Sequence, residues 1–388
     1  MGTSATRETD AAVVSWCIMS DQAVVVNVDL PGREYPIHIG VNLLERAGEL
    51  LRARSAARRA AVVTDANVGP LYAGRLGDSL RQGGFEYDLI AVPAGDESKS
   101  LQSAAFIYDR LAARRHDRTE PVIALGGGMV GDLAGFAAAT WLRGVPFVQC
   151  PTTVEADVDA GVGGKTAVNH PAGKNLIGCF YQPTLVCIDI TCLGTLTERD
   201  FAAGLAESVK HAVVRDRAFF EWHEGNRGEI RAHAPDAIRE LIERNCRNKA
   251  AVVVADERET DQRGVGRAAL NFGHTIGHVL ESQWNYVLRH GEAVALGMVA
   301  AMDLAVARAG FAEEERGRVE ALLAALGLPT RAPLPIDIRD AMRRLGTDKK
   351  VRDQTVRFVV PTTIGSVRWL DGPETGDIER AIHRLLGP

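Results

Sequence analysis

The sequence lacks the features of a nucleic-acid-binding, membrane-embedded or disulfide-bonded protein. Its 45 lysine and arginine residues are outnumbered by 50 aspartate and glutamate residues, so the net charge of −5 offers no excess of cations to a polyanion. It contains no run of 18 or more apolar residues and no basic segment leading into an apolar one, so we expect neither a membrane span nor a secretory signal. Its six cysteines form no C-x-x-C pair, which argues against a zinc finger and favours a reducing cytoplasm.

The composition is that of a soluble globular protein with enough chain for two domains. Apolar residues make up 46% and charged residues 24% of the 388 positions. The small polar residues at 1–20 predict a disordered lead-in. Residues 21–190 alternate short apolar runs with helical patterns, which predicts an α/β domain with a largely parallel sheet. Residues 191–388 have mostly helical patterns, so we expect a mainly α-helical second domain.

The expected strands are short and apolar, and the first two surround a turn. Residues 23–29 and 35–40 flank Leu30-Pro31-Gly32-Arg33, a pattern typical of a hairpin. Further strands are expected at residues 60–64, 87–92, 122–125, 147–150, 185–189 and 356–360. Helices are expected at residues 43–51, 101–114, 199–214, 236–256, 270–283, 292–309 and 314–326.

A glycine-rich turn, Gly126-x-Gly128-x-x-Gly131, directly follows the strand expected at 122–125 and precedes a helical pattern. Such a turn lets phosphate oxygens approach backbone N–H groups at a helix start, although any tight strand-to-helix turn also needs glycine. The acidic residue that dehydrogenases usually carry about 20 positions further on is not evident, so an ordinary dehydrogenase half is disfavoured. Asp65 and Asn67 follow another strand and either bind ribose or adenine or form a simple turn.

Histidine and glutamate residues in the second half supply the ligands that a zinc-type cation prefers. Glu207 and Lys210 share one face of an expected helix, and their apolar neighbours favour a buried role over a surface ion pair. His274 and His278 lie four residues apart on one helix face, and spacing alone leaves open which of them is the ligand. With His290 also present, metal binding is favoured over separate core histidines.

A glycine-punctuated loop over residues 163–175 contains two lysines and two asparagines between apolar runs. It offers donors to a phosphorylated or carboxylated substrate, whereas a solvated loop is the plainer alternative. The local sequence around Lys249 and Arg267 indicates only surface charges, and the same holds for Lys349 and Lys350.

Seven segments resemble the 3-dehydroquinate synthase family of sugar phosphate cyclases, and the resemblance runs in order from about residue 25 to residue 365. They are Pro151-Thr152-Thr153, Asp159-x5-Lys165-Thr166-Ala167-Val168-Asn169-His170-Pro171, Gly173-Lys174-Asn175, Ala206-Glu207-x-x-Lys210-His211, Asp256-Glu257-Arg258, Asn271-x-Gly273-His274-Thr275 and His290-Gly291-Glu292-Ala293-Val294. The resemblance implies an N-terminal Rossmann-like domain, a helical C-terminal domain, bound NAD, one zinc or cobalt ion and a homodimer.

The resemblance also implies roles for individual residues. The metal ligands become Glu207, His274 and His290, and His278 moves to the substrate pocket. The implied catalytic residues are Lys165, Glu207, Lys210, Lys249, Arg267, Asn271 and His278. Further substrate positions are Asp159, Asn175, one of Lys349 or Lys350, and Arg143, which the family lends across its dimer interface. The cofactor positions are Asp65, Asn67, Asp96, Lys99, Gly127, Gly128, Asp132, Thr152, Thr153 and Lys174.

The implied reaction converts a phosphorylated keto-sugar acid, 3-deoxy-D-arabino-heptulosonate 7-phosphate, into 3-dehydroquinate and phosphate. Lys249, Arg267 and Asn271 suit a substrate carboxylate, which disfavours sedoheptulose 7-phosphate cyclases but leaves amino-dehydroquinate synthases open. A metal-dependent polyol dehydrogenase is less favoured because that family lacks the 163–175 loop. A non-catalytic relative is disfavoured because no implied metal ligand is missing.

The chain departs from the family pattern in its acidic residues and in one insertion. Asp96 replaces the usual glutamate, and Glu155 and Asp157 stand where the family has less acidic residues. The segment at 261–266 is longer than expected before Arg267. We expect the added negative charge ahead of Asp159 to alter a neighbouring ionisation or an interface.

Overall fold

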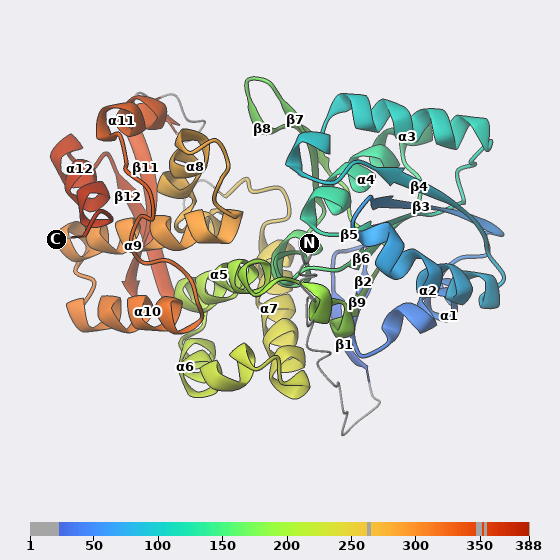
Figure 1. Cartoon of the computed structure of the whole chain (residues 1–388), viewed down its shortest axis with the longest axis horizontal. Helices are drawn as coiled ribbons and strands as arrows, with labels where there is room; N and C mark the ends of the chain where they lie inside the picture. The colour runs from blue at the N-terminus through green and yellow to red at the C-terminus, as the bar shows by residue number, and fades with distance from the viewer. Residues whose placement is uncertain (1–22, 262–264, 347–350, 353–354, 388) are drawn as a thin grey trace, which may run out of the picture.

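The computed structural model describes residues 23–261, 265–346, 351–352 and 355–387. They form an α/β domain and a mainly helical domain that lie side by side (Figure 1). The lead-in expected at residues 1–20 lies outside the described residues, as do Lys349 and Lys350. Within the described ranges, no helix is long and apolar enough to cross a membrane.

Seven strands form one sheet in the α/β domain. In spatial order they are β1 (Val24–Val28), β2 (Tyr35–Gly40), β9 (Leu185–Asp189), β6 (Phe147–Pro151), β5 (Val122–Gly126), β3 (Arg59–Asp65) and β4 (Glu86–Val92). Every neighbouring pair is parallel except β1 and β2. All residues of β5 and β9 are buried, as a parallel sheet covered on both faces requires. The expected α/β fold is confirmed.

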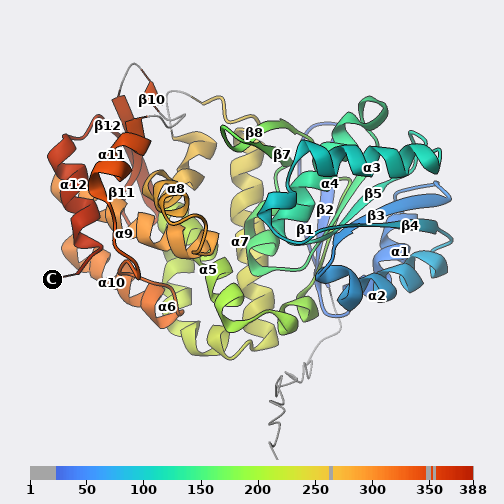
Figure 2. The ribbon, with the colours of Figure 1, turned by 45° about the horizontal axis from the view of Figure 1, so that its top comes forward.

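Helices cover both faces of this sheet. The helices α1 (Ala47–Arg52) and α2 (Val68–Gln82) contribute to the hydrophobic core on one face. The helices α3 (Leu101–Ala113) and α4 (Gly128–Thr140) contribute to the core on the other face. Figure 2 shows α2 and α3 on opposite sides of the strands. Because α4 starts directly after β5, the glycine turn lies at the carboxyl edge of the sheet, where α/β folds bind ligands.

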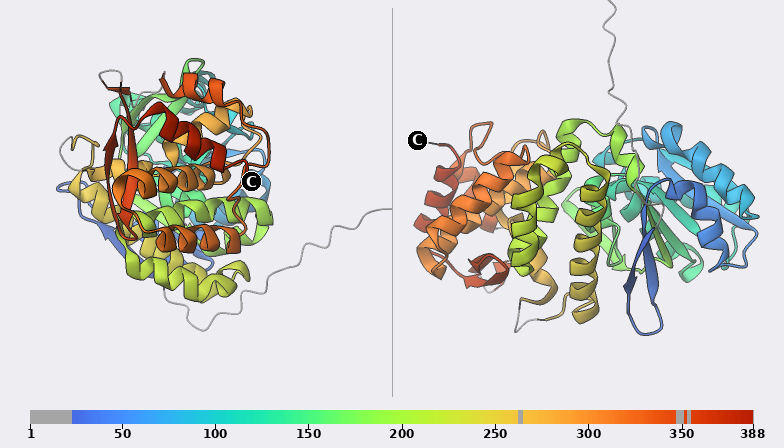
Figure 3. Two further views of the ribbon diagram at one scale, coloured as in Figure 1. Left: turned by 90° about the vertical axis from the view of Figure 1, so that its left-hand side faces the viewer. Right: turned by 90° about the horizontal axis from the view of Figure 1, so that it is seen from below.

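The expected first hairpin is present as β1 and β2, and it connects the two domains. Its turn includes Gly32 with φ 73°, a left-handed conformation that favours glycine. Val26 and Ile37 share one hydrophobic core with residues of α7 (Pro235–Ala255), which lies beside the hairpin in Figure 3. Burial of these apolar side chains therefore stabilises the contact between the domains.

The segment expected as a loop at residues 163–175 is largely a second hairpin. Its antiparallel strands β7 (Lys165–His170) and β8 (Gly173–Phe180) are joined by Pro171 and Ala172. Glycine, lysine and asparagine interrupt the period-two pattern of apolar residues, so the sequence gives no clear strand signal here. The hairpin projects from the α/β domain between the two halves of the molecule (Figure 1).

The second domain is built mainly from helices, as expected. Besides α7 it contains α5 (Glu198–Arg215), α6 (Arg217–Arg231), α8 (His274–Gln283), α9 (His290–Ala309), α10 (Glu313–Ala325), α11 (Ile338–Gly346) and α12 (Thr375–Arg384). Its three antiparallel strands are β10 (Val351–Arg352), β11 (Thr355–Thr363) and β12 (Ser366–Asp371). The short helical turns of the chain are η1 (Leu43–Arg46), η2 (Asp96–Ser98), η3 (Trp141–Arg143), the π-helix η4 (Ala156–Ala160), η5 (Ile190–Thr195) and η6 (Gly266–Asn271).

Two features of this domain differ from the expected helices. The helices α6, α11 and α12 are additional to those that the sequence pattern indicates. The helix expected from residue 270 begins only at His274, because Gly273, directly before it, adopts the left-handed φ of 81° and prevents a continuous helix from η6 into α8.

Candidate active site

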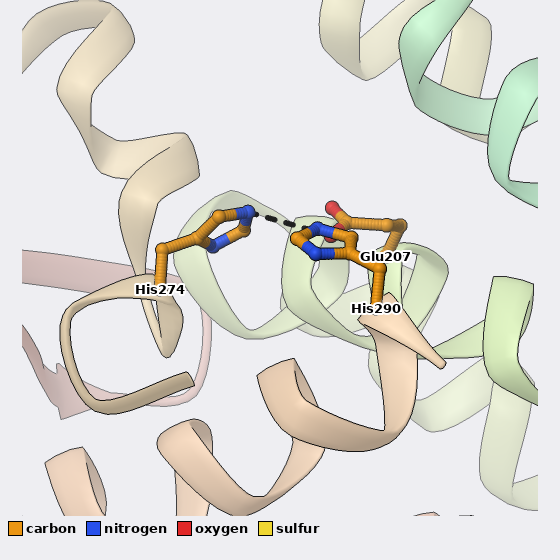
Figure 4. A group of neighbouring side chains, drawn as sticks. All are labelled: Glu207, His274 and His290. Carbon is orange, nitrogen blue, oxygen red and sulfur yellow. Dashed lines mark ion pairs between the residues drawn. The ribbon is translucent and has the colours of Figure 1, made fainter. Parts of the chain in front are cut away.

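Three side chains from three helices of the second domain meet at one point. Glu207 projects from α5, His274 from the start of α8 and His290 from the start of α9 (Figure 4). The Oε1 atom of Glu207 lies 3.6 Å from Nε2 of His274 and 3.5 Å from Nε2 of His290. The carboxylate of Glu207 is buried, and its Oε2 atom pairs with the Lys210 ammonium group while Oε1 faces the two imidazole rings. One carboxylate and two imidazole nitrogens form a donor set that fits a zinc-type ion.

Glycines beside the two histidines let the helices approach closely enough to form this group. A Cβ atom on Gly291 would lie 1.8 Å from the backbone oxygen of Ala203 on α5. A Cβ atom on Gly273 would lie 2.8 Å from the backbone oxygen of Val294 on α9. Glu292 accepts the backbone N–H of Arg289, which helps to fix the start of α9. The motif His290-Gly291-Glu292 therefore combines a candidate ligand, a close helix contact and a helix cap.

The structure favours His274 over His278 as the ligand that shares an ion with Glu207. His278 is exposed one helical turn further along α8, and its ring centroid lies 5.3 Å from that of His274. It belongs to a second possible ligand group with Glu281 and His290. This placement agrees with the substrate-pocket position that the resemblance gives to His278, and that role remains a prediction.

Buried charges extend from these candidate metal ligands toward α7. Lys210 forms ion pairs with Glu207 and, at 3.8 Å, with Oδ2 of Asp159 on η4. Lys249 donates to the carboxylate of the same aspartate. Burial opposes ionisation of Asp159, but the two ammonium groups outweigh it and hold its pKa well below the ordinary value. Burial lowers the pKa of Lys249 to about 8 although Asp159 acts in the opposite direction.

A row of buried, hydrogen-bonded polar side chains lies behind Asp159, and no sequence pattern predicts a role for them. Nε2 of His211 lies 3.4 Å from Oδ1 of Asp159, and Nδ1 lies 2.9 Å from Oδ1 of Asn245. The Asn245 amide donates to Ser208, whose hydroxyl contacts His223 at 2.7 Å. Nearly all of α5 is buried, so it lacks the polar and apolar faces that would have separated these side chains from ordinary core residues.

Several expected substrate residues gather beside this group. Lys165 and Asn271 both contact the carboxylate of Glu259, at 2.5 and 2.9 Å respectively. Arg267 is almost fully buried and donates to the backbone oxygens of Glu257 and Gly163 at 2.6 and 2.8 Å. The chain thus already places a carboxylate against two donors that the resemblance assigns to substrate.

The carboxyl edge of the sheet has the features of a dinucleotide site. The helix α4 begins after Gly127 with no side-chain cap, so its first N–H groups face outward. A Cβ atom on Gly127 would lie 3.1 Å from Cγ2 of Thr153, which leaves little space for a larger residue. The hydroxyl of Thr152 is buried with no hydrogen-bond partner among the described residues. These features fit a pyrophosphate held by backbone N–H groups, and Gly128 lies at the same turn.

The other expected cofactor residues occupy neighbouring positions. The carboxylate of Asp65, at the end of β3, accepts the backbone N–H groups of Asn67 and Val68 at 2.8 and 2.9 Å. Lys99 forms an ion pair with Asp132 and donates to Oδ1 of Asn175 at 2.5 Å. These contacts attach the β7–β8 hairpin to the glycine-turn helix.

Two further expected cofactor residues pair with each other across this edge. Nζ of Lys174, on the hairpin, lies 3.2 Å from Oδ2 of Asp96 on η2. Oδ2 of Asp96 also accepts from the side chain of Asn169 at 3.2 Å.

Arg143 is the described candidate that is not joined to these groups. It is exposed after α4, in a left-handed segment where Leu142 has φ 49° and Arg143 has φ 68°. Its side chain makes no hydrogen bond or ion pair with any other residue that the structure describes. The other exceptions, Lys349 and Lys350, lie outside the described residues.

Comparisons with known proteins agree with this geometry. Residues 89–203 match the family model described as 3-dehydroquinate synthase N-terminal, and residues 204–351 match 3-dehydroquinate synthase C-terminal. The chain is 44% identical over 354 residues to a 3-dehydroquinate synthase from Desulforamulus reducens, covering 91% of this chain and 98% of that protein.

Solved structures share the fold over nearly the whole chain. The 2-epi-5-epi-valiolone synthase ValA from Streptomyces hygroscopicus, with NAD+ and Zn2+ bound, is 30% identical with a TM-score of 0.78, covering 86% of this chain and 94% of that one. A 2-deoxy-scyllo-inosose synthase complexed with carbaglucose-6-phosphate, NAD+ and Co2+ is 23% identical with a TM-score of 0.85, covering 93% of this chain and 99% of that one.

Proposed function

The chain belongs to the 3-dehydroquinate synthase family, and on that premise we propose that it is a phosphate-eliminating cyclase, a carbon–oxygen lyase. Its substrate would be 3-deoxy-D-arabino-heptulosonate 7-phosphate, and its products 3-dehydroquinate and phosphate in the shikimate pathway. The observation that carries the proposal is the position of Glu207, His274 and His290 beside buried cations that already hold carboxylates.

The chain contains residues that suit both the metal ion and the NAD of the proposed reaction. Glu207, His274 and His290 would hold a zinc or cobalt ion, and the glycine turn with Asp65, Lys99 and Thr152 would hold NAD. When bound, NAD would take and return a hydride, and the ion would act as a Lewis acid toward a substrate oxygen. The chain's own residues therefore have to place the substrate between these two positions.

Cationic and amide side chains would orient the two ends of the substrate. Lys165, Lys249 and Arg267 would face its carboxylate, with Lys165 exchanging Glu259 for the substrate. Lys210 and Asn175 would face its phosphate. The leaving phosphate would accept the proton from the neighbouring carbon, so that no dedicated protein base is needed at that step.

A direct assay tests the proposal. The purified protein is mixed with the seven-carbon keto-acid phosphate, catalytic NAD and zinc, while phosphate release is followed and the product is identified by NMR. We expect one phosphate per dehydroquinate and no net NADH. Net NADH formed from an alcohol would indicate a polyol dehydrogenase instead, and turnover of only the amino analogue or of sedoheptulose 7-phosphate would move the chain to another cyclase.

We also propose a cytoplasmic homodimer in which Arg143 completes the site of the second copy. Its exposure and its separation from its own site support this role, and the five described cysteines are all unpaired, as in a reducing compartment. Mixing inactive Arg143→Ala and Glu207→Gln subunits tests it. Exchange into mixed dimers restores one complete site in half of the dimers, or about a quarter of the wild-type activity. No recovery after demonstrated exchange would contradict the role across the interface.

A further inference from the structure

Glu281 is a buried carboxylate directly behind one of the proposed metal ligands. It lies on α8, is 3% exposed, and its Oε1 atom is 3.3 Å from Nδ1 of His290. The other ring nitrogen of His290, Nε2, points to Glu207 at 3.5 Å. A ring nitrogen that donates to a carboxylate is fixed as N–H, which leaves the lone pair of the other nitrogen directed at a cation.

Glu281 also contacts the hairpin of the other domain. Its Oε1 atom lies 3.6 Å from Nζ of Lys174 on β8. The same ammonium group lies 3.2 Å from Asp96 and 4.0 Å above the ring centroid of Tyr286. One carboxylate therefore lies between a ligand from the helical domain and a cation from the α/β domain.

The loop between α8 and α9 is folded in a way that supports this arrangement. Asn285 and Tyr286 have φ angles of 48° and 59°, which residues other than glycine rarely adopt. The backbone N–H of Tyr286 donates to the backbone oxygen of Glu281 at 2.8 Å. The turn therefore places the Tyr286 ring over the Lys174 ammonium group.

We propose that Glu281 is a positioning residue that orients His290 for metal binding. Through its contact with Lys174 it also links the position of the β7–β8 hairpin to the affinity of the metal site. This inference rests on the metal site proposed above. Its consequence is that a substitution in the hairpin, at Lys174, weakens metal binding although Lys174 is no ligand.

Zinc affinity measured by competition with a chromophoric chelator tests this directly, without turnover. For Glu281→Leu, which removes both charge and acceptor, we expect zinc to bind about 10- to 100-fold more weakly. Glu281→Gln keeps an acceptor oxygen and should weaken binding less. Lys174→Met should weaken it by up to about fivefold, as expected for the loss of one partly exposed ion pair.

A matched control variant and the number of zinc ions bound per chain distinguish failure of the metal site from failure of the positioning role. Glu315→Gln removes a half-exposed pair with Arg217 elsewhere in the helical domain and should leave zinc affinity unchanged. The wild type should bind one zinc ion per chain, and absence of binding would refute the metal site itself. Two ions per chain would instead make His278, Glu281 and His290 a second site and overturn the positioning role.

The remaining outcomes address Glu281 alone. Wild-type zinc affinity in folded Glu281→Leu overturns the proposal. If that variant fails to fold by circular dichroism, unchanged affinity in both Glu281→Gln and Lys174→Met overturns it. If the effects of the Glu281 and Lys174 substitutions on zinc affinity are additive in the double variant, the coupling to the hairpin is refuted. Substitutions within one network are expected to have non-additive effects.

Discussion

Two aspartates on one π-helix show how a displacement of two residues reverses the electrostatics of a carboxylate. Asp159 faces the candidate site, where Lys210, Lys249 and His211 hold its pKa well below the ordinary value despite its burial. Asp157 faces the hydrophobic core, and both of its oxygens are buried with no hydrogen-bond partner among the described residues. Burial, with a smaller contribution from Asp189, raises its pKa well above the ordinary value.

One short element thus directs the carboxylate of Asp159 toward the candidate site and leaves the carboxyl group of Asp157 unpaired in the hydrophobic core. The π-helix η4 packs between α5 and α7, so its carboxylates have either ammonium groups or apolar side chains as neighbours. A π-helix is rare and is often retained for function, since its extra residue redirects side chains. The orientation of Asp159 is thus accompanied by an unpaired acid at Asp157.

The largest effect should follow from Asp159→Asn. This change leaves the Lys210 and Lys249 ammonium groups without their shared carboxylate, and breaking such a buried pair costs about 3–5 kcal/mol. We expect kcat/KM for phosphate release to fall by at least about 100-fold, a barrier increase of about 2.7 kcal/mol, because neither ammonium group is then held in position for the substrate. Activity within tenfold of wild type would show that Asp159 does not organise the two lysines.

The same substitution two residues earlier should have the opposite effect on stability. Asp157→Asn removes a carboxyl group whose charged form is disfavoured in the core. Because the folded-state pKa is raised, the folded protein retains a proton that the unfolded chain releases, so wild-type stability declines as pH rises above about 4. The variant should therefore be more stable than the wild type at pH 8, because an amide has no carboxyl proton to lose in the core.

Urea unfolding at pH 4 and pH 8 measures this difference for the two proteins. The stabilities of wild type and Asp157→Asn should converge at the lower pH, and kcat/KM at pH 8 should be unchanged. A constant stability difference between the two pH values would show that the carboxyl group of Asp157 finds a partner in solution.

The sequence predicts the fold better than it predicts which polar side chains meet. Alternating apolar runs and helical patterns identify the parallel sheet, because strands buried on both faces leave a strong local signal. The β7–β8 hairpin leaves no such signal, since its lysines and asparagines face other segments rather than a core. The positions of Asp157 and Asp159 likewise depend on the π-helix, which no local sequence pattern predicts.

The candidate metal site shows the same limit at the level of single residues. His274 and His278 share one helix face, so only the tertiary packing of the helices decides that His274 lies beside Glu207. Glu281 lies three residues after His278, but its contact with His290 depends on the turn between two helices. Sequence motifs identify the candidates, and tertiary packing decides their partners.

The smallest expected effect concerns the cation that Asp159 holds. Lys249 has a pKa of about 8 because burial disfavours its charged form, so its positive charge is lost as pH rises through that value. Since kcat/KM reports ionisations of the free enzyme, it should fall above pH 8 by up to about tenfold per pH unit in the wild type. Lys249→Arg keeps its charge throughout, so the descending limb should disappear even if the longer side chain lowers activity overall. A wild-type profile that stays level to pH 9.5, or an equal decline in Lys249→Arg, would assign the limb to another group and separate Lys249 from substrate binding.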